Sequence, residues 1–213
     1  MSAVDRAIIA RLLQPFAALD ANQLDRISSY LDLLLKWNAK TNLTSVRIPE
    51  EIVTRHFGES LFAASRLLAP GAGATVIDLG SGAGFPGLPF AIWSPVVQVT
   101  LLESNARKAA FLNEVIHALQ LTNARALRQR GEDNPGQADL VTMRAVEEFA
   151  KSAPVALKLV QAAGRLALMI GSAQVDQAKA LLRDVTWDPI IPVPGSRARV
   201  ILSGTKLAKV GRS

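Results

Sequence analysis

The stretch Val76-Ile77-Asp78-Leu79-Gly80-Ser81-Gly82-Ala83-Gly84-Phe85-Pro86-Gly87 decides the fold of this chain. A short apolar run leads into a glycine-rich turn, and the proline after the turn suits the start of a helix. Glycines allow positive φ and let a ligand approach the backbone closely. The pattern predicts a buried strand, a ligand-binding turn and a helix, the unit from which open α/β sheets are built.

The spacing of the glycines and the acids around them indicate the ligand. Gly80, Gly82 and Gly84 follow G-x-G-x-G, whereas dinucleotide folds use G-x-G-x-x-G around a pyrophosphate. Asp78 adds negative charge, which disfavours a pyrophosphate and favours the cationic amino-acid end of S-adenosylmethionine. The next strand ends at Glu103, whose carboxylate is placed to accept hydrogen bonds from both ribose hydroxyls. We therefore expect S-adenosylmethionine as cofactor and S-adenosylhomocysteine as product. The alternative is an ordinary βα turn with a solvent-facing Glu103.

Outside this unit the chain divides into a helical part and an alternating part. Apolar residues recur at helical spacing in 3–13 and 20–37, and Pro49 opens a third helix. We therefore assign residues 1–70 to an N-terminal helical cap and residues 71–213 to a core. In the core, short apolar runs alternate with helix-like segments, which predicts a mostly parallel, Rossmann-like sheet covered on both faces.

The expected core elements can be bounded from the same pattern. Strands are expected at 74–79, 97–102, 124–128, 138–143 and 165–170, and helices at 105–119, 147–162 and 174–183. Two further strands, 186–193 and 197–203, are separated only by Pro194-Gly195-Ser196 and form an antiparallel terminal hairpin. Strand order, glycine turn and hairpin together resemble class I methyltransferases.

Composition excludes several classes of protein. The 213 residues contain no cysteine, which removes disulfides, zinc ribbons and a cysteine nucleophile, and the two histidines form no metal-ligand pattern. No apolar run is long enough to span a membrane, and the N-terminus does not have the shape of a signal peptide. We expect a cytoplasmic, metal-free monomer with no membrane segment.

The net charge of +6, from 24 basic and 18 acidic residues, suits a polyanionic partner. The basic residues gather at 125–130 and after Asp188, although a solvated basic face is the alternative interpretation. The second group includes Lys209 and Arg212. The RNA-binding candidates are Arg128, Arg130, Arg197, Arg199 and Lys206.

The segment after the fourth strand limits which atom is methylated. Residues 141–146, VTMRAV, lack the Asn/Asp-Pro-Pro-aromatic loop of exocyclic-amine methylation, and carbon-5 methylation of a pyrimidine needs a cysteine. A purine ring nitrogen such as guanine N7 carries no proton, so alignment alone could suffice and no general base is required. This exclusion does not by itself select guanine.

Specific motifs carry a closer resemblance. Lys36-Trp37-Asn38, the segment 42–47 (NLTSVR), Arg55-His56, the glycine turn and Arg144-Ala145 are similar to the bacterial 16S rRNA guanine-N7 methyltransferases, the RsmG or GidB family. The resemblance covers residues 25–205. It implies N7 methylation of one guanosine in helix 18 of 16S rRNA, in the decoding region of the small ribosomal subunit.

The resemblance also implies roles for individual residues. The cofactor would be held by the glycine turn, Phe85, Glu103, Gly131-Glu132 and Arg144, and Asn42 and Thr44 would lie beside the active site. Arg144 and Asn42 are thus the candidate catalytic residues. Arg144 lies at the carboxyl edge of the sheet, where it could donate to the methionine carboxylate, an RNA phosphate or guanine O6. The alternative is a surface arginine paired with Glu147 or Glu148.

The chain departs from the family pattern at three positions. Ile170 replaces a lysine, Glu59 replaces an aspartate and Ala198 replaces a histidine. Three rival functions stay open: another S-adenosylmethionine-dependent transferase acting on a small molecule or a different RNA, a dinucleotide oxidoreductase, and a non-catalytic RNA-binding assembly factor.

Overall fold

The computed structural model describes residues 4–146 and 148–208. Glu147, Lys209 and Arg212, which were considered above, lie outside these ranges. The described strands form one sheet in the order β3-β2-β1-β4-β5-β8-β6, with β7 paired to β8 alone. Their bounds are β1 Thr75–Leu79, β2 Gln98–Leu102, β3 Ala124–Leu127, β4 Ala138–Arg144, β5 Val160–Gly171, β6 Val185–Trp187, β7 Ile191–Pro192 and β8 Arg199–Lys206.

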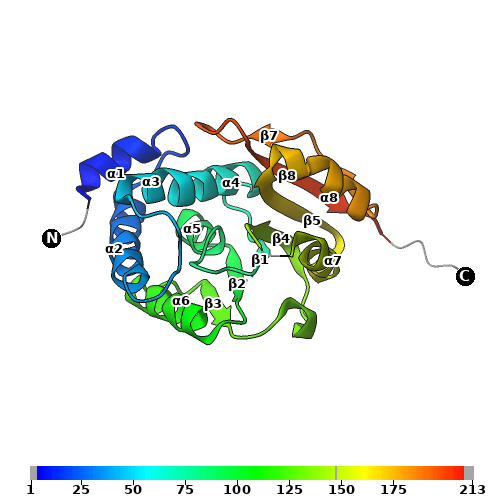
Figure 1. The fold of residues 1–213 in the computed structure, drawn as a ribbon, viewed down its shortest axis with the longest axis horizontal. Coiled ribbons are helices and arrows are strands. Elements are labelled where there is room, and N and C mark those ends of the chain that lie inside the picture. The colour runs from blue at the N-terminus through cyan, green and yellow to red at the C-terminus, as the bar shows by residue number, and fades with distance from the viewer. Residues whose placement is uncertain (1–3, 147, 209–213) are drawn as a thin grey trace, which may run out of the picture.

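The first five strands are parallel and the last ones antiparallel, which confirms the expected Rossmann-like sheet (Figure 1). β8 pairs antiparallel with β5 on one side and with β6 on the other, so it lies inside the sheet. The expected strand at 186–193 is divided, since β6 ends at Trp187 and β7 begins at Ile191, although the Asp188 amide still donates to the Ser203 carbonyl of β8. The hairpin itself is present as β7 and β8.

Eight α-helices are found within the described ranges. They are α1 Arg6–Leu13, α2 Ala21–Asn38, α3 Pro49–Ile52, α4 Glu59–Leu67, α5 Gly87–Trp93, α6 Ala106–Ala118, α7 Phe149–Leu159 and α8 Val175–Leu181. A capping box between Asp20 and Gln23 starts α2, and a proline in the first turn starts α3. A π-helical segment, Val53–Gly58, joins α3 to α4 without a break. Such segments are rare and often occur at functional sites.

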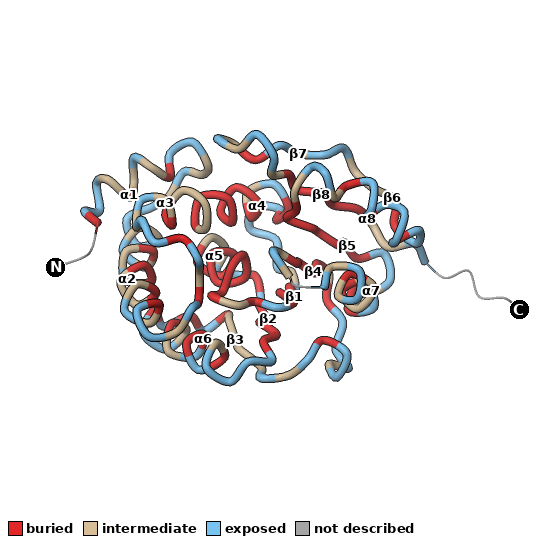
Figure 2. Tube along the Cα trace, viewed as in Figure 1, coloured by how far each residue is buried: buried red, intermediate tan, exposed pale blue. Residues whose placement is uncertain are grey.

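Two hydrophobic clusters lie on opposite faces of the sheet. Along β5, Ala167 and Met169 belong to the cluster that contains α2, α4, α5 and α6, whereas Leu166 and Leu168 belong to the cluster with α7 and α8. This alternation follows the period of two in a strand. Figure 2 shows the buried residues on the strands and on the inner sides of the helices. The N-terminal helices therefore share one core with the sheet.

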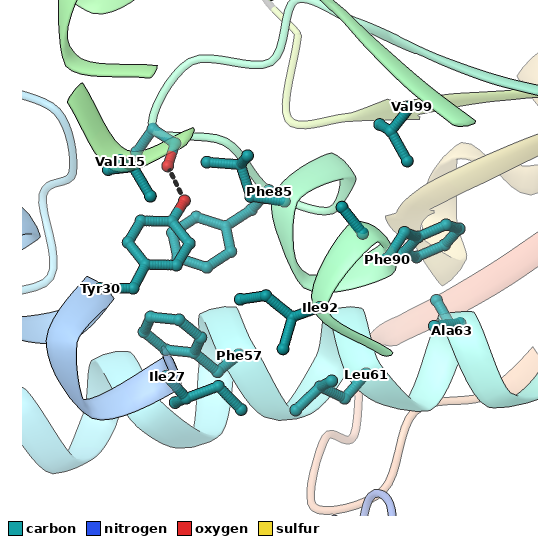
Figure 3. Close-up of a cluster of buried hydrophobic side chains, with 14 of the residues drawn as sticks. Ile27, Tyr30, Phe57, Leu61, Ala63, Phe85, Phe90, Ile92, Val99 and Val115 are labelled. Atoms are coloured by element: carbon teal, nitrogen blue, oxygen red, sulfur yellow. Dashed lines mark hydrogen bonds between the residues drawn. The ribbon is translucent and has the colours of Figure 1, made fainter. Parts of the chain in front are cut away.

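An aromatic group joins the N-terminal helices to the glycine turn (Figure 3). The Tyr30 ring of α2 stacks on Phe85 of the turn with ring centroids 5.4 Å apart and planes 6° apart. Phe57 meets Phe85 edge-on at 5.0 Å. The Tyr30 hydroxyl also donates a hydrogen bond to the carbonyl of Ala83. The turn is thus held from outside the sheet by side chains that come more than 25 residues earlier in the sequence.

Candidate active site

The glycine turn between β1 and α5 has the backbone geometry expected of a ligand cradle. Gly80, Gly82 and Gly84 have φ of 69°, 56° and 91°, in the left-handed region that favours glycine. A Cβ built on Gly82 would meet no atom closer than 3.8 Å, so the space beside this backbone is open. These features fit the close approach of the cofactor's amino-acid end.

Glu103 follows β2 and is tied to the turn. Its carboxylate accepts hydrogen bonds from the amide of Gly82 at 2.9 Å and from the amide of Asn105 at 2.8 Å. An ionised carboxylate has about four acceptor sites, so two protein amides leave capacity for ribose hydroxyls. Glu103 is buried, with 7% of its surface exposed. The geometry does not support a freely solvated surface carboxylate.

The structure gives Asp78 a different role from the expected contact with the cofactor. Its side chain is fully buried, and its two oxygens accept hydrogen bonds from Thr142 Oγ1 at 2.9 Å and from the Gly87 amide at 3.1 Å. Burial raises the pKa of Asp78 to about 6, against hydrogen bonds that lower it. Both oxygens face the protein, so the expected direct contact with the cofactor is not what this geometry provides. Asp78 instead fixes the turn to β4 and α5.

Phe85 also requires a correction. Its ring is 7% exposed and packs among Tyr30, Phe57 and His56, the last with ring centroids 5.1 Å apart. The side chain therefore points toward the N-terminal helices. Only the backbone of this residue is positioned like the rest of the turn.

Gly131 and Glu132, which the family resemblance assigns to the cofactor site, lie at the carboxyl edge of the sheet. They begin a 3₁₀ turn, Gly131–Asp133, which follows β3. A Cβ on Gly131 would approach Leu79 Cδ1 to 2.5 Å and Val155 Cγ1 to 2.9 Å, so the backbone packs tightly on the end of β1. Glu132 is exposed beside it. Position 131 therefore requires glycine because a side chain would clash with these neighbours, and not because of its backbone φ angle.

Arg144, at the end of β4, is the centre of a polar network with the π-helical segment. Its guanidinium is close to five groups: the Arg55 carbonyl at 2.7 Å, His56 Nδ1 at 3.2 Å, the Glu59 carboxylate at 3.3 Å, and Ser60 Oγ and the His56 carbonyl, both at 3.4 Å. Its side chain is 12% exposed. The alternative of a surface arginine paired with Glu148 is therefore wrong, since Glu148 pairs with Lys151 at 2.5 Å.

Glu59 holds two arginines at once. One carboxylate oxygen is 3.3 Å from Nη2 of Arg144 and the other is 2.6 Å from Nε of Arg199. The Glu59 side chain is 3% exposed. The sequence singled out this residue only as a departure from the family pattern, and its partners lie 85 and 140 positions away. Arg199 is thus half-buried in an ion pair and is not a free surface cation.

The loop after α2 is held by a residue that was quoted in a motif but given no role. Asn38 is 6% exposed, and its side-chain oxygen accepts hydrogen bonds from the amides of Leu43 and Thr44 at 2.9 and 3.0 Å. Asn42 is exposed and accepts a hydrogen bond from Arg47 at 3.1 Å. Thr44, by contrast, points inward and its hydroxyl lies 2.7 Å from Nε2 of His56.

The expected basic cluster after Asp188 is divided by the sheet. Arg199 is opposite Gly171 at the carboxyl end of β5, whereas Lys206 is at the far end of β8. The seven steps of β8 between them span roughly 23 Å at about 3.3 Å per residue. Lys206 donates to the carbonyl of Val160. The two residues therefore cannot belong to one surface patch at the cofactor edge, as the sequence spacing had suggested.

Arg128 and Arg130 are exposed after β3, at the same carboxyl edge as the glycine turn but on its other flank. Arg197 is exposed in the turn before β8. Ile170, at the position where the resemblance implies a lysine, is 7% exposed and packs in the cluster of α7 and α8. The Ile170 replacement therefore alters that face of the sheet.

A cavity of about 410 Å³ that the sequence did not indicate opens beside this network. It lies where α1, the π-helical segment and the turn before β8 meet. Its charged lining residues are Arg11, Arg55, Glu59 and Arg199, and Phe16 adds an aromatic ring. The local excess of positive charge suits an anionic ligand such as a phosphodiester.

Metal-binding groups and membrane-spanning helices can be assessed for the described residues. Among them, no group of three or more histidine, aspartate or glutamate side chains has an arrangement that could hold a metal ion. No helix in residues 4–146 and 148–208 is both long and apolar enough to cross a bilayer.

The fold resembles solved methyltransferases. The magnesium protoporphyrin IX methyltransferase from Synechocystis PCC 6803, solved with bound SAM, superposes with a TM-score of 0.65 at 16% identity, covering 89% of this chain and 99% of that one. The fold is that of the class I S-adenosylmethionine-dependent methyltransferases.

The sequence identifies the family within this class. Residues 23–194 match the family described as GidB, rRNA small subunit methyltransferase G. Ribosomal RNA small subunit methyltransferase G of Xanthomonas euvesicatoria pv. vesicatoria (strain 85-10) is 41% identical over 182 residues, covering 84% of each chain. The protein of that name from Stenotrophomonas maltophilia (strain K279a) is 38% identical over 207 residues, covering 93% of this chain and 96% of its own. The chain belongs to the GidB family of small-subunit rRNA methyltransferases.

Proposed function

We propose that this protein transfers the methyl group of S-adenosylmethionine to N7 of a guanosine in helix 18 of 16S rRNA. The observation that carries the proposal is the contact between the family's characteristic segments and the cofactor turn. Thr44 meets His56, and the His56 ring lies 5.1 Å from Phe85 of the turn and 3.2 Å from Arg144 of β4. The relatives named as ribosomal RNA methyltransferases supply the substrate class.

The residues at this edge suit a reaction that removes no proton. Bound in the turn, S-adenosylmethionine supplies an electrophilic methyl group. Burial and the arginines around it lower the pKa of His56 to about 3, so this side chain is neutral near pH 7. Arginine remains protonated and cannot act as a base. The protein groups nearest to the turn therefore act by positioning, which is sufficient for attack by an N7 lone pair.

The RNA is proposed to lie across the carboxyl edge of the sheet. The exposed Arg197, beside the arginine-lined cavity, provides a cation on one flank, and Arg128 and Arg130 provide cations on the other. Phosphate contacts of this kind position a nucleic acid without reading its sequence. Asn42, exposed on the loop before α3, is proposed to contact the RNA near the target.

The decisive experiment maps N7-methylguanosine in 16S rRNA from cells with and without the gene. We expect one guanosine in helix 18 to lose its methyl group in the deletion strain and regain it on complementation. Purified protein should transfer radiolabelled methyl groups to small subunits, or to their naked 16S rRNA, from the deletion strain. Methylation at another position would correct the target, and complementation by an inactive variant would support an assembly factor instead.

A further inference from the structure

The hydrogen bonds of His56 determine its tautomer. Nδ1 of the ring is 3.2 Å from Nη2 of Arg144, and a guanidinium can only donate. This contact favours the tautomer in which Nδ1 is the unprotonated nitrogen. Because His56 is neutral near pH 7, its one ring proton is on Nε2, which is the nitrogen facing Thr44 at 2.7 Å. Arg144 thus fixes which nitrogen of the histidine donates.

The tautomer in turn fixes the direction of the Thr44 hydroxyl. Its oxygen accepts from His56 Nε2 and also from the amide of Val46 at 3.1 Å. A hydroxyl has two acceptor lone pairs and one proton, so both lone pairs are used. Within the described part of the chain, the hydroxyl has no further partner among the hydrogen bonds of the structure. Thr44 can therefore offer only a donor to an incoming molecule.

This donor lies close to the glycine turn, where we expect the methyl group of the cofactor and therefore the target base. His56 packs on Phe85 of the glycine turn and is hydrogen-bonded to Arg144 at the end of β4. Only the imidazole ring of His56 therefore separates Thr44 from these two residues. Thr44 is half-buried, which leaves its hydroxyl partly shielded from water. Asn38 holds the Thr44 amide at 3.0 Å and prevents the loop from turning this side chain outward.

We propose that Thr44 is a specificity-determining residue whose hydroxyl donates a hydrogen bond to O6 of the target guanine. This inference rests on the proposed methylation of guanine N7. The Hoogsteen edge of guanine carries two acceptors, N7 and O6, whereas adenine presents a donor at position 6. A donor at N7 would occupy the lone pair that attacks the methyl group, so O6 is the acceptor left for Thr44. Arg144 and His56 act through Thr44 as positioning residues.

The test combines substitutions in the protein with one in the RNA. Thr44→Val removes the hydroxyl at similar volume and Thr44→Ser retains it. The substrates are small subunits reconstituted with 16S rRNA that carries either guanosine or 2-aminopurine at the target position. 2-Aminopurine keeps N7 and the 2-amino group but lacks O6. kcat/KM for methyl transfer is measured for each pair.

The expected result is a coupled loss. Replacing guanosine with 2-aminopurine should lower kcat/KM of the parent protein by about 10–100-fold, as for an unpaired buried polar group. With guanosine, Thr44→Val should lower kcat/KM by a similar factor. With 2-aminopurine, Thr44→Val should have nearly the same kcat/KM as the parent protein on that substrate. Thr44→Ser should resemble the parent on both substrates. Equal losses on both substrates would mean that Thr44 contacts a phosphate or supports the loop, and would overturn the assignment. If the parent methylates neither substrate, the proposed function itself is wrong.

The positioning role of His56 has its own readout, the ratio of kcat/KM for guanosine over 2-aminopurine. His56→Gln can place a carbonyl toward Arg144 and an N–H toward Thr44, so it should keep most of this ratio. His56→Leu cannot orient the hydroxyl, and the ratio should fall by about 10-fold or more. A ratio that is unchanged in His56→Leu would refute the positioning role, even if the overall rate decreases.

Discussion

The guanidinium of Arg144 at the end of β4 and the carboxylate of Glu59 at the start of α4 form an ion pair that is closed off from solvent. Their side chains are 12% and 3% exposed, and their nearest nitrogen and oxygen atoms are 3.3 Å apart. This pair connects the sheet edge beside the glycine turn to the N-terminal helices. It makes Arg144 a structural residue as well as a candidate for catalysis.

Arg144→Ala should therefore reduce both stability and activity. Glu59 keeps its ion pair with Arg199, but the Arg55 carbonyl and His56 Nδ1 lose their donor, and a buried polar group left unsatisfied costs about 1–3 kcal/mol. A surface arginine, the alternative considered from the sequence, could be removed with almost no change in thermal stability, whereas this side chain is only 12% exposed. Arg144→Lys should recover part of the stability and little of the methylation rate, because a point charge does not reproduce a planar fork.

Urea unfolding and a methylation assay on small subunits measure the two effects separately. The matched control is Glu148→Gln, which breaks the exposed pair with Lys151 and should change stability little. Stability close to that of the parent in Arg144→Ala would contradict the assignment of a buried ion pair.

Tyr30→Phe tests how the N-terminal helices support the cofactor turn. The substitution keeps the ring stack on Phe85 and removes the hydroxyl that donates to the Ala83 carbonyl. A buried carbonyl without its donor costs about 1–3 kcal/mol, and the freed turn should bind S-adenosylmethionine more weakly. Calorimetric titration with the cofactor measures the change in Kd.

A comparison variant separates this effect from a general loss of stability. Trp37→Phe removes another hydrogen bond between α2 and the core, from Nε1 to Glu114 at 3.0 Å, but at a distance from the turn. It should destabilise the fold without changing cofactor affinity. Equal Kd values for the two variants would show that Tyr30 has no specific effect on the turn.

The parts of the site that were predicted from sequence depend on local geometry. A strand that runs into a glycine turn, and a second strand that ends in an acid, place Gly82 and Glu103 at one edge because parallel strands align their carboxyl ends. The short apolar runs likewise bounded β1 and β2 to within one residue. Residues that are close together in the sequence are sufficient to determine these features.

The parts that were missed depend on tertiary contacts. Asp78 has the charge expected of a cofactor ligand, but Thr142 of β4, 64 residues away, takes one of its oxygens. The π-helical segment that presents His56 differs from an α-helix only in hydrogen-bond register, which residue spacing does not encode. In the sequence, Glu59 looks like any acidic residue at the start of a helix. Its two arginine partners, Arg144 of β4 and Arg199 of β8, are distant in the sequence and meet it only in the folded chain.

Asp78 should titrate unusually late for an aspartate. Its pKa is about 6 in the folded protein against an ordinary value of 3.8. Between these values the folded state keeps a proton that the unfolded state has lost. The contribution to stability is therefore full below about pH 4 and is lost as the pH rises through about 6, a change of about 3 kcal/mol.

Carboxyl-carbon NMR follows this titration directly, and a midpoint near 4 would contradict it. Asp78→Asn provides the thermodynamic comparison, since it lacks the titrating group while other groups are common to both proteins. The unfolding free energy of the parent relative to this variant should decrease between pH 4 and 6.

Glu103→Ala should weaken cofactor binding by about 1–3 kcal/mol, the usual scale for hydrogen bonds to a charged group. The carboxylate is lost both as an acceptor for ribose and as a partner of the Gly82 amide. Glu103→Gln keeps one acceptor oxygen and should give an intermediate Kd in calorimetry. An unchanged Kd in the alanine variant would remove Glu103 from the cofactor site.

The final prediction concerns which basic residues face the RNA. Binding of small subunits should weaken with salt, because each neutralised phosphate releases counterions, while cofactor affinity should hardly change. Arg197→Glu, in the exposed turn beside the arginine-lined cavity, should reduce the slope of log K against log salt by about 1. Arg183→Glu makes the same change in charge just before β6, beside Lys206 at the opposite edge of the sheet.

The pair separates a local contact from an effect of net charge. If the RNA lies across the carboxyl edge, only Arg197→Glu changes the slope, since Arg183 is then farther from the phosphates than the screening length of roughly 8–10 Å. Equal changes in the two variants would mean that overall positive charge attracts the subunit without a defined face. A larger change in Arg183→Glu would place the RNA on the opposite edge and would contradict the proposed approach to the glycine turn.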